Sequence, residues 1–156
     1  MKKQKQTNIT YKNKKAFHDY EDIENRIAGI VLTGMEMKSI RNGQVNLSDS
    51  YCRFAGNELF VHHTYISNPE RFEKHQHDNN LRDFRPRKLL LRKHELKHLK
   101  QMVKEKGLTI IPLYLFIDER GFAKMQIALC RGRHTYDKKE AIKRKDLQRE
   151  ASRQLE

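Results

Sequence analysis

The segment from Ile27 to Tyr51 constrains the fold of this chain more than any other stretch. It opens with β-prone residues at 30–32 and breaks at Thr33 and Gly34, so a buried strand is expected to end there. Residues 35–41 then predict a short amphipathic helix with Asn42 and Gly43 as its C-terminal cap. We expect a charged outer face on this helix, made by Glu36, Lys38, Ser39 and Arg41. Cap and turn residues follow before a second strand.

Two hairpins and a longer helix are predicted further along the chain. Residues 51–54 and 58–63 flank a loop of Ala55, Gly56 and Asn57, which is typical of a hairpin. Apolar residues recur at helical spacing up to Lys106, and Gly107 is expected to end that helix. Residues 108–117 and 121–129 predict the second hairpin. About five strands with two or three short helices indicate a mainly β fold, which we predict to be a small closed antiparallel barrel.

The composition indicates one domain that binds a polyanion. The chain has 156 residues, enough for one modest core, and a formal net charge of +13. No apolar run approaches the roughly 20 residues of a membrane-spanning helix. No apolar signal segment follows the basic residues at the N-terminus. Nucleic acid is therefore favoured over a membrane as the partner, and a cytoplasmic location is predicted.

Basic segments flank the predicted core. Residues 1–12 predict a basic, solvated N-terminal arm, either a solubilising tail or a phosphate-contacting arm, and the same lysine-rich character continues to residue 15. Asn13 is expected to cap a short helix. Residues 68–84 predict a long surface loop. Residues 131–156 predict a basic tail that is disordered when free and helical when RNA neutralises its lysines; a plain basic tail is the alternative.

Catalysis and metal binding find little support in the sequence. His94 and His98 belong to a literal H-E-x-x-H pattern, but at about 100° per residue both imidazoles lie away from the apolar stripe of the helix. A zinc hydrolase is therefore the weak alternative, and no catalytic residue, cofactor or metal is predicted. His62 and His63 should point to opposite faces of one strand. Cys52 and Cys130 predict free buried thiols, with a disulfide less favoured.

The sequence does support RNA binding. Basic residues cluster around the aromatic Phe84, a mixture that is typical of a surface that neutralises phosphates and stacks on unpaired bases. They are Arg82, Arg85, Arg87, Lys88, Arg92 and Lys93.

Several blocks of this sequence resemble the SsrA-binding protein family, also called small protein B, the partner of transfer-messenger RNA. The resemblance is carried by residues 29–51, by Arg85 to Leu91, by Lys104 to Leu113 and by Gly132 to Lys139, in the order and spacing of the family. It runs from about Asn13 to the C-terminus. It implies an OB-like RNA-binding barrel over residues 13–130.

The resemblance also implies partners and site residues. The barrel would bind the transfer-RNA-like domain of transfer-messenger RNA, and the tail would occupy the vacant decoding site and mRNA path of a stalled bacterial ribosome. Elongation factor Tu would be engaged indirectly, through charged transfer-messenger RNA. The expected RNA-binding residues are Lys38, Arg41, Arg85, Arg87, Lys88, Leu90 and Lys124. The expected decoding-site residues of the tail are Gly132, Tyr136, Asp137, Lys138, Lys139 and Lys143.

This chain departs from the family pattern at two informative positions. Ile27 stands where the family usually has Glu, so a polar contact made there must be lost or supplied by a neighbour such as Glu24 or Arg26. Lys139 stands where Arg is usual, which keeps the charge and loses bidentate phosphate geometry. The competing hypothesis is a general ribosome-associated or single-strand RNA-binding OB protein.

Overall fold

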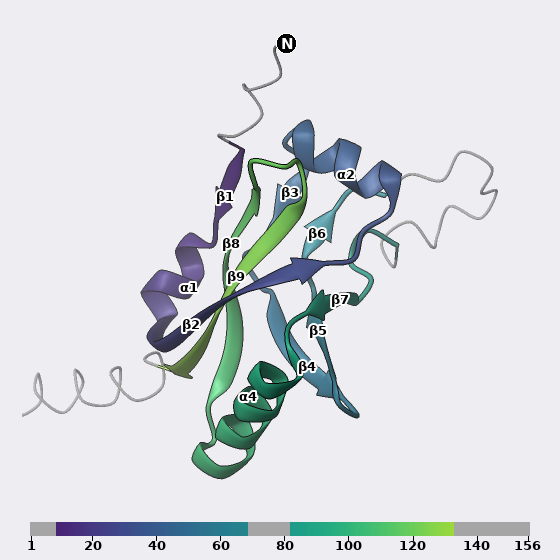
Figure 1. The fold of residues 1–156 in the computed structure, drawn as a ribbon. Coiled ribbons are helices and arrows are strands. Elements are labelled where there is room, and N and C mark those ends of the chain that lie inside the picture. Colours follow the sequence, from purple (N-terminus) through teal and green to yellow (C-terminus); the bar gives the residue numbers. More distant parts are fainter. Residues whose placement is uncertain (1–8, 69–81, 133–156) are drawn as a thin grey trace, which may run out of the picture.

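The structure is a computed structural model that describes residues 9–68 and 82–132. It is mainly β sheet with a few short helices (Figure 1). The strands are β1 Thr10–Lys12, β2 Tyr20–Ile30, β3 Val45–Asn46, β4 Tyr51–Ala55, β5 Glu58–His62, β6 Tyr65–Ile66, β7 Arg87–Leu90, β8 Thr109–Ile117 and β9 Ala123–Gly132. The helices are α1 Lys14–Asp19, α2 Gly34–Arg41 and α4 Lys93–Lys106.

The strand pairings of the main sheet return to their starting point. Pairing runs in the order β8, β4, β5, β7, β2 and β9, and β9 pairs again with β8. Two joins in this ring are short, because β4 meets β8 through Cys52 and Ile110 alone and β2 meets β7 through two residue pairs. Strand β1 pairs with residues 114–116 of β8, outside the ring. Strands β3 and β6 form a separate two-stranded sheet. The predicted mainly β fold is confirmed.

Strand periodicity explains which side chains form the core. On β5, Leu59 and Val61 are fully buried, while the alternating Phe60 and His62 are partly exposed, as the two-residue period of a strand requires. The main cluster is formed by side chains of this kind from most of the strands together with Leu99 of α4. Ala16 of α1 belongs to a second, smaller cluster with residues of β8 and β9. Both predicted hairpins are confirmed.

The two longer helices begin and end where local signals place them. Thr33 caps α2 in a capping box: its hydroxyl accepts from the N–H of Glu36, and the Glu36 carboxylate accepts from the N–H of Thr33. At the other end of α2, Gly43 comes directly after the C-cap residue Asn42 and has a positive φ of +82°. Gly107 ends α4 in the left-handed region with φ +64°. The predicted outer face of α2 is wrong in part, because Glu36 and Ser39 are buried at 0% and 4% exposure.

Other local differences from the sequence expectations concern strands. Residues 10–12, which were expected to lie in the solvated arm, form β1, because their backbone pairs with residues 114–116 of β8. Asn13 caps α1 as predicted, accepting from the N–H of Ala16. The strand expected at 30–32 begins at Tyr20 and ends at Ile30, and Val31 is 45% exposed rather than buried. Residues 87–90 form β7, a strand that the periodicity analysis did not separate from the following helix.

The two longest helices lie at opposite ends of the molecule. In Figure 1, α2 lies at the end that carries the turn between β8 and β9, and α4 lies at the other end. Within the described ranges 9–68 and 82–132, no helix has the length and apolar character needed to cross a membrane.

Candidate nucleic-acid interface

An apolar surface flanked by a cation lies on the outer side of β2. Gly29 of β2 is paired with Leu90 of β7 on one side and with Lys124 of β9 on the other, so these three residues form one row across three strands. Ile27 lies two residues away on the same face of β2 and is 58% exposed; Leu90 is 52% exposed. We call the set of Ile27, Gly29, Leu90, Phe122 and Lys124 the β2 surface.

Gly29 leaves the backbone of β2 bare next to the side chain of Leu90. A β-carbon added at Gly29 would lie 3.4 Å from the β-carbon of Leu90, at the near limit of ordinary van der Waals contact. Leu90 therefore leans over the backbone of β2. A hollow of about 310 Å³ lies here, lined by Leu90, Phe122 and Lys124 among others. Phe122 is 61% exposed, and so much apolar surface on a chain of net charge +13 indicates a contact surface.

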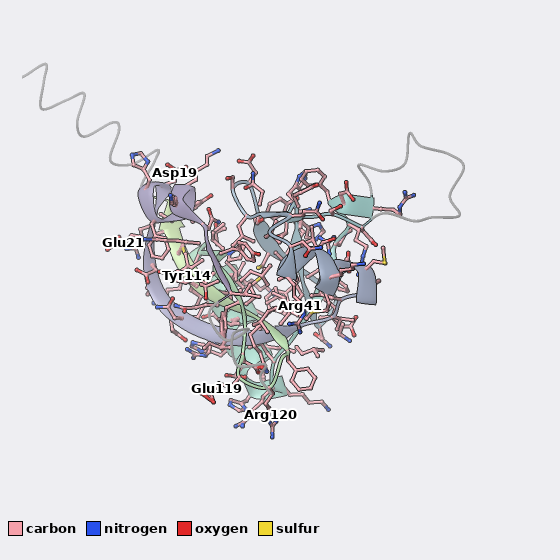
Figure 2. The ribbon with its side chains drawn as sticks, turned by 90° about the horizontal axis from the view of Figure 1, so that it is seen from above. Asp19, Glu21, Arg41, Tyr114, Glu119 and Arg120 are labelled. Carbon is pink, nitrogen blue, oxygen red and sulfur yellow. The ribbon has the colours of Figure 1, made fainter. Side chains whose placement is uncertain are left out.

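One cation of α2, Arg41, lies at the edge of this hollow, next to Gly121. Lys38 and Arg41 of α2 are both exposed. Arg41 lies against the turn between β8 and β9, because a β-carbon added at Gly121 would be 3.8 Å from an Arg41 guanidinium nitrogen. Glu119 and Arg120 belong to the same turn and project from its outer end (Figure 2). The structure thus brings the predicted residues Leu90, Lys124 and Arg41 into one region that combines apolar and positively charged groups.

Arg87 does not belong to this surface. It is 0% exposed, and its guanidinium contacts Glu36 at 2.6 Å, so it cannot reach a phosphate. The prediction that Arg87 contacts RNA is therefore wrong, because the strand alternation of β7 turns it inward. Arg85 is one third exposed and binds Glu36 through two nitrogens, at 2.7 and 3.0 Å. Lys88 is 40% exposed and pairs with Glu58 at 2.6 Å.

Glu36 is the centre of a buried charge network that the sequence analysis placed in solvent. Its carboxylate accepts hydrogen bonds from Arg85, from Arg87 Nε at 2.8 Å and from Asn68 Nδ2 at 3.3 Å. Burial by itself raises the pKa of Glu36, but the hydrogen bonds from Arg85, Arg87 and Thr33 outweigh it and hold this pKa below its usual range. Glu36 is therefore ionised in the folded protein.

The network also fixes the two chain segments on either side of residues 69–81. Arg87 donates to the carbonyl oxygens of Thr64, Ile66 and Asp83, while the N–H of Asn68 donates to the Asp83 carboxylate at 2.8 Å. Residues 64–68 and 82–83 are thus joined through one guanidinium. The predicted long loop lies mostly outside the described residues, but its two ends meet here.

A row of rings follows the ends of β4 and β5. Tyr51 stacks on His62 with ring centres 5.2 Å apart, and it also contacts His63 at 5.6 Å. Phe84 contacts His63 and Tyr65 at 6.5 and 5.5 Å. The prediction that His62 and His63 point to opposite faces is wrong, because β5 ends at His62 and His63 turns in the left-handed region with φ +61°.

The remaining histidines and cysteines have structural surroundings. His98 is 42% exposed and contacts Glu24 of β2 at 2.9 Å, while His94 is exposed. Among residues 9–68 and 82–132 no group of three or more His, Cys, Asp or Glu could hold a metal ion. Cys52 and Cys130 are free and buried, as predicted. Burial raises the pKa of both thiols, that of Cys130 to about 12.

The expected tail site lies almost wholly outside the described part of the chain. Gly132 is the last residue of β9. Tyr136, Asp137, Lys138, Lys139 and Lys143 fall in the segment 133–156, outside the described residues. Phe122 was not predicted from the sequence, although its position beside Gly121 in a hairpin turn was a usable signal for an exposed aromatic residue.

Comparisons with known proteins agree on one family. The family model described as SmpB protein matches residues 10–156. An SsrA-binding protein of Flavobacterium johnsoniae is 48% identical over 141 residues, covering 90% of this chain and 91% of the relative. An SsrA-binding protein of Moorella thermoacetica is 44% identical over 151 residues, covering 97% and 95%. A chain of the solved structure "tmRNA-SmpB: a journey to the center of the bacterial ribosome" has a TM-score of 0.63 and 42% identity, covering 80% of this chain and 85% of that one.

Proposed function

Because the chain belongs to the SmpB protein family, we propose that it is a non-enzymatic adaptor that binds the transfer-RNA-like domain of transfer-messenger RNA. The proposal rests on the β2 surface, where Leu90 and Lys124 flank the bare backbone of Gly29. An exposed apolar side chain can pack on an unstacked base or sugar while the lysine neutralises a phosphate. The solved relative at 42% identity is named for a tmRNA-SmpB assembly with the bacterial ribosome.

Ile27 gives this surface a more apolar character than the family pattern implies. Glu24 does not replace the missing Glu, because its carboxylate is already engaged by Arg26 and His98. The β2 surface therefore reads RNA here through shape and apolar contact, with charge from Lys124, Lys38 and Arg41. Arg85 and Arg87 support it indirectly, by holding α2 through Glu36.

The ring of strand pairings supports the view that the sheet is a closed, OB-like barrel. We propose that this barrel holds the RNA while residues 131–156 occupy the vacant decoding site and mRNA path of a stalled ribosome. Tyr136 would stack there, and Lys138, Lys139 and Lys143 would neutralise ribosomal RNA. Elongation factor Tu would be engaged through the charged RNA. This work takes place in the cytoplasm.

Competition binding at physiological salt tests the proposal. A labelled transfer-RNA-like domain is bound by the full chain in the presence of excess total tRNA or random RNA, since phosphate-driven affinity depends steeply on salt. The variant Leu90→Ala with Lys124→Ala should bind at least tenfold more weakly. Its matched control, Ile23→Ala with Lys14→Ala, removes the same kinds of exposed group elsewhere and should bind normally.

A chain that ends at Gly132 separates the two parts of the proposal, because it keeps all of β9. It should bind the RNA domain almost as tightly as the full chain and should fail to restart stalled ribosomes. If random RNA competes as well as the specific RNA, the adaptor proposal fails. The alternative, a general ribosome-associated or single-strand RNA-binding protein, then takes its place.

A further inference from the structure

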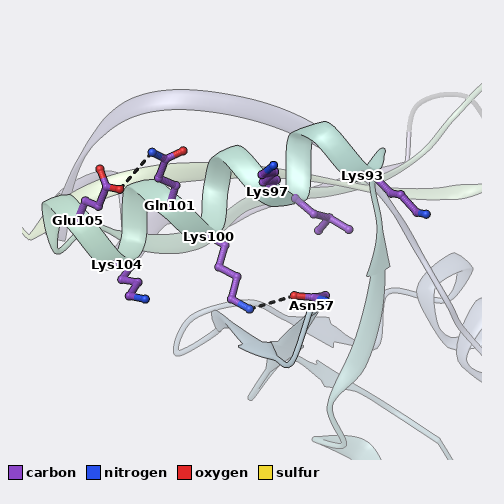
Figure 3. Close-up of a pocket in the computed structure, with 8 residues that line it drawn as sticks. Asn57, Lys93, Lys97, Lys100, Gln101, Lys104 and Glu105 are labelled. Atoms are coloured by element: carbon purple, nitrogen blue, oxygen red, sulfur yellow. Dashed lines mark hydrogen bonds between the residues drawn. The ribbon is translucent and has the colours of Figure 1, made fainter.

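One face of α4 carries a row of lysines beside a groove. The groove has a volume of about 760 Å³ and lies between α4 and the turn that joins β4 and β5 (Figure 3). Its lining residues that matter for charge and shape are Lys93, Lys97, Lys100, Lys104, Leu96 and Asn57. The four lysines recur every three or four residues, which places them along one side of the helix. We call this feature the lysine groove.

The positions of Lys93 and Lys97 do not serve the stability of the helix, whereas Lys104 lies in its last turn, where a cation is favourable. Lys93 is the first residue of α4, where a cation opposes the helix dipole, and like charges four residues apart repel one another. Among the described residues, no carboxylate lies within ion-pair distance of Lys93, Lys97 or Lys104. The row is therefore a concentration of positive charge that an external anion can neutralise.

One lysine shapes the groove. Lys100 donates to the Gly56 carbonyl at 2.7 Å and to Asn57 Oδ1 at 3.1 Å, and so it bridges α4 to the β4–β5 turn. In Figure 3 the Lys100 side chain reaches across to Asn57, and Lys104 projects to the same side of the helix. The carboxylate in the lining, Glu105, accepts from Gln101 at 3.1 Å. Four lysines against one carboxylate leave the groove strongly positive.

We propose that the lysine groove binds an RNA backbone without regard to its sequence. Lys93 and Lys104 are separated by about 16 Å along the helix, at 1.5 Å per residue. This length is matched by roughly five phosphates of one stacked strand, at about 3.4 Å per phosphate along the axis. The lining contains no aromatic ring and no arginine, so it offers point charges to phosphates rather than a platform for bases.

The groove extends the β2 surface rather than duplicating it. Lys93 comes three residues after Leu90, so the row begins beside the β2 surface and runs away from it along α4. An RNA held specifically by the β2 surface can thus continue along the helix, which adds affinity without adding specificity. This inference rests on the proposed function for the choice of RNA as the polyanion.

Salt-dependent binding of the full chain tests the inference, with labelled oligouridine as the probe. Lys97→Gln with Lys104→Gln removes two groove charges and keeps good helix formers, and it leaves the Lys100 bridge intact. The slope of log K against log salt should become shallower by about 1.4, since each lost single-strand phosphate contact changes it by about 0.7. The control, Lys14→Gln with Lys106→Gln, removes two exposed lysines outside the groove and should change the slope by less than half as much.

The outcomes separate this inference from the proposed function. Equal slopes for the groove variant and its control would overturn the lysine groove as a site. If the groove variant has a shallower slope but still prefers the transfer-RNA-like domain over random RNA, both proposals stand. If the unaltered chain shows no such preference while the slope difference persists, the adaptor proposal fails and the groove remains.

Discussion

Replacing Glu36 with glutamine is the most direct test of how the fold is held together around α2. The two side chains have nearly the same shape, so the change removes a charge without opening a cavity. The Glu36 carboxylate is 0% exposed and faces donors from Arg85, Arg87 and Asn68. A glutamine retains one acceptor oxygen, but its NH₂ group must face another donor. Arg87, also fully buried, then loses its counter-ion.

The structure allows the size of this effect to be judged. Removing one partner of a buried ion pair costs about 3–5 kcal/mol, because the remaining charge stays buried and uncompensated. A domain of this size shifts its Tm by roughly 3–5 °C per kcal/mol, so Glu36→Gln should lower the Tm by roughly 10–25 °C. Glu58→Gln is the matched control. Glu58 pairs with Lys88 at 2.6 Å, the same distance, but in solvent, where such a pair contributes about 0–1 kcal/mol.

Thermal unfolding for the Tm and urea unfolding for the free energy, both at pH 7 and followed by circular dichroism, measure both variants. The pH dependence supplies a second check with a defined sign. The folded pKa of Glu36 is depressed, so its contribution is present above the ordinary carboxyl pKa and is lost as the pH falls through the folded value. The difference between Glu36→Gln and the unaltered chain should therefore shrink below about pH 4.5. A loss under 1 kcal/mol at pH 7, equal to that of Glu58→Gln, would refute the reasoning.

Three further predictions concern other parts of the fold. Cys52 and Cys130 should resist a thiol reagent at pH 8 in the native protein and react together on unfolding, since both are buried with raised pKa values; reaction of either in the native state would contradict this. Gly107→Ala should destabilise by about 1 kcal/mol in urea, because its φ of +64° is left-handed while a β-carbon would meet no atom. Leu59→Ala, at a fully buried position, should cost about 2–5 kcal/mol in the same assay, and a cost near zero would mean that this part of the core is loosely packed.

Features with local causes could be predicted from the sequence. Thr33, Gly43 and Gly107 mark helix ends because capping and left-handed backbone depend on a few adjacent residues. The hairpin around Gly56 was predictable for the same reason. Strand β1 was not, because residues 10–12 show no period of their own and are ordered by β8, a partner far away in the sequence.

In the candidate site too, features that depend on distant residues could not be predicted from the local sequence. The burial of Glu36 depends on Arg85 and Arg87, which lie 49 and 51 positions further along the chain, and a helical period alone places Glu36 on the polar side. Arg87 can be buried because the buried Glu36 carboxylate compensates its charge. By contrast, Leu90 and Lys124, which the resemblance implies as RNA-binding residues, both pair with Gly29 and so lie on one surface, although neither residue is unusual in its local sequence.

The pairing of β2 with β9 has a consequence for how the chain acquires its fold. Asn25 and Gln126 contact each other across 101 positions of sequence. During synthesis β2 is made early, yet β9, which pairs along most of its length, is made last among the described strands, so one edge of β2 stays unpaired until then. Contacts of such sequence separation slow folding, and an open edge invites pairing with other chains. The β4–β5 hairpin can form as soon as its two strands are made, whereas the ring of strands closes only after β9 has been made.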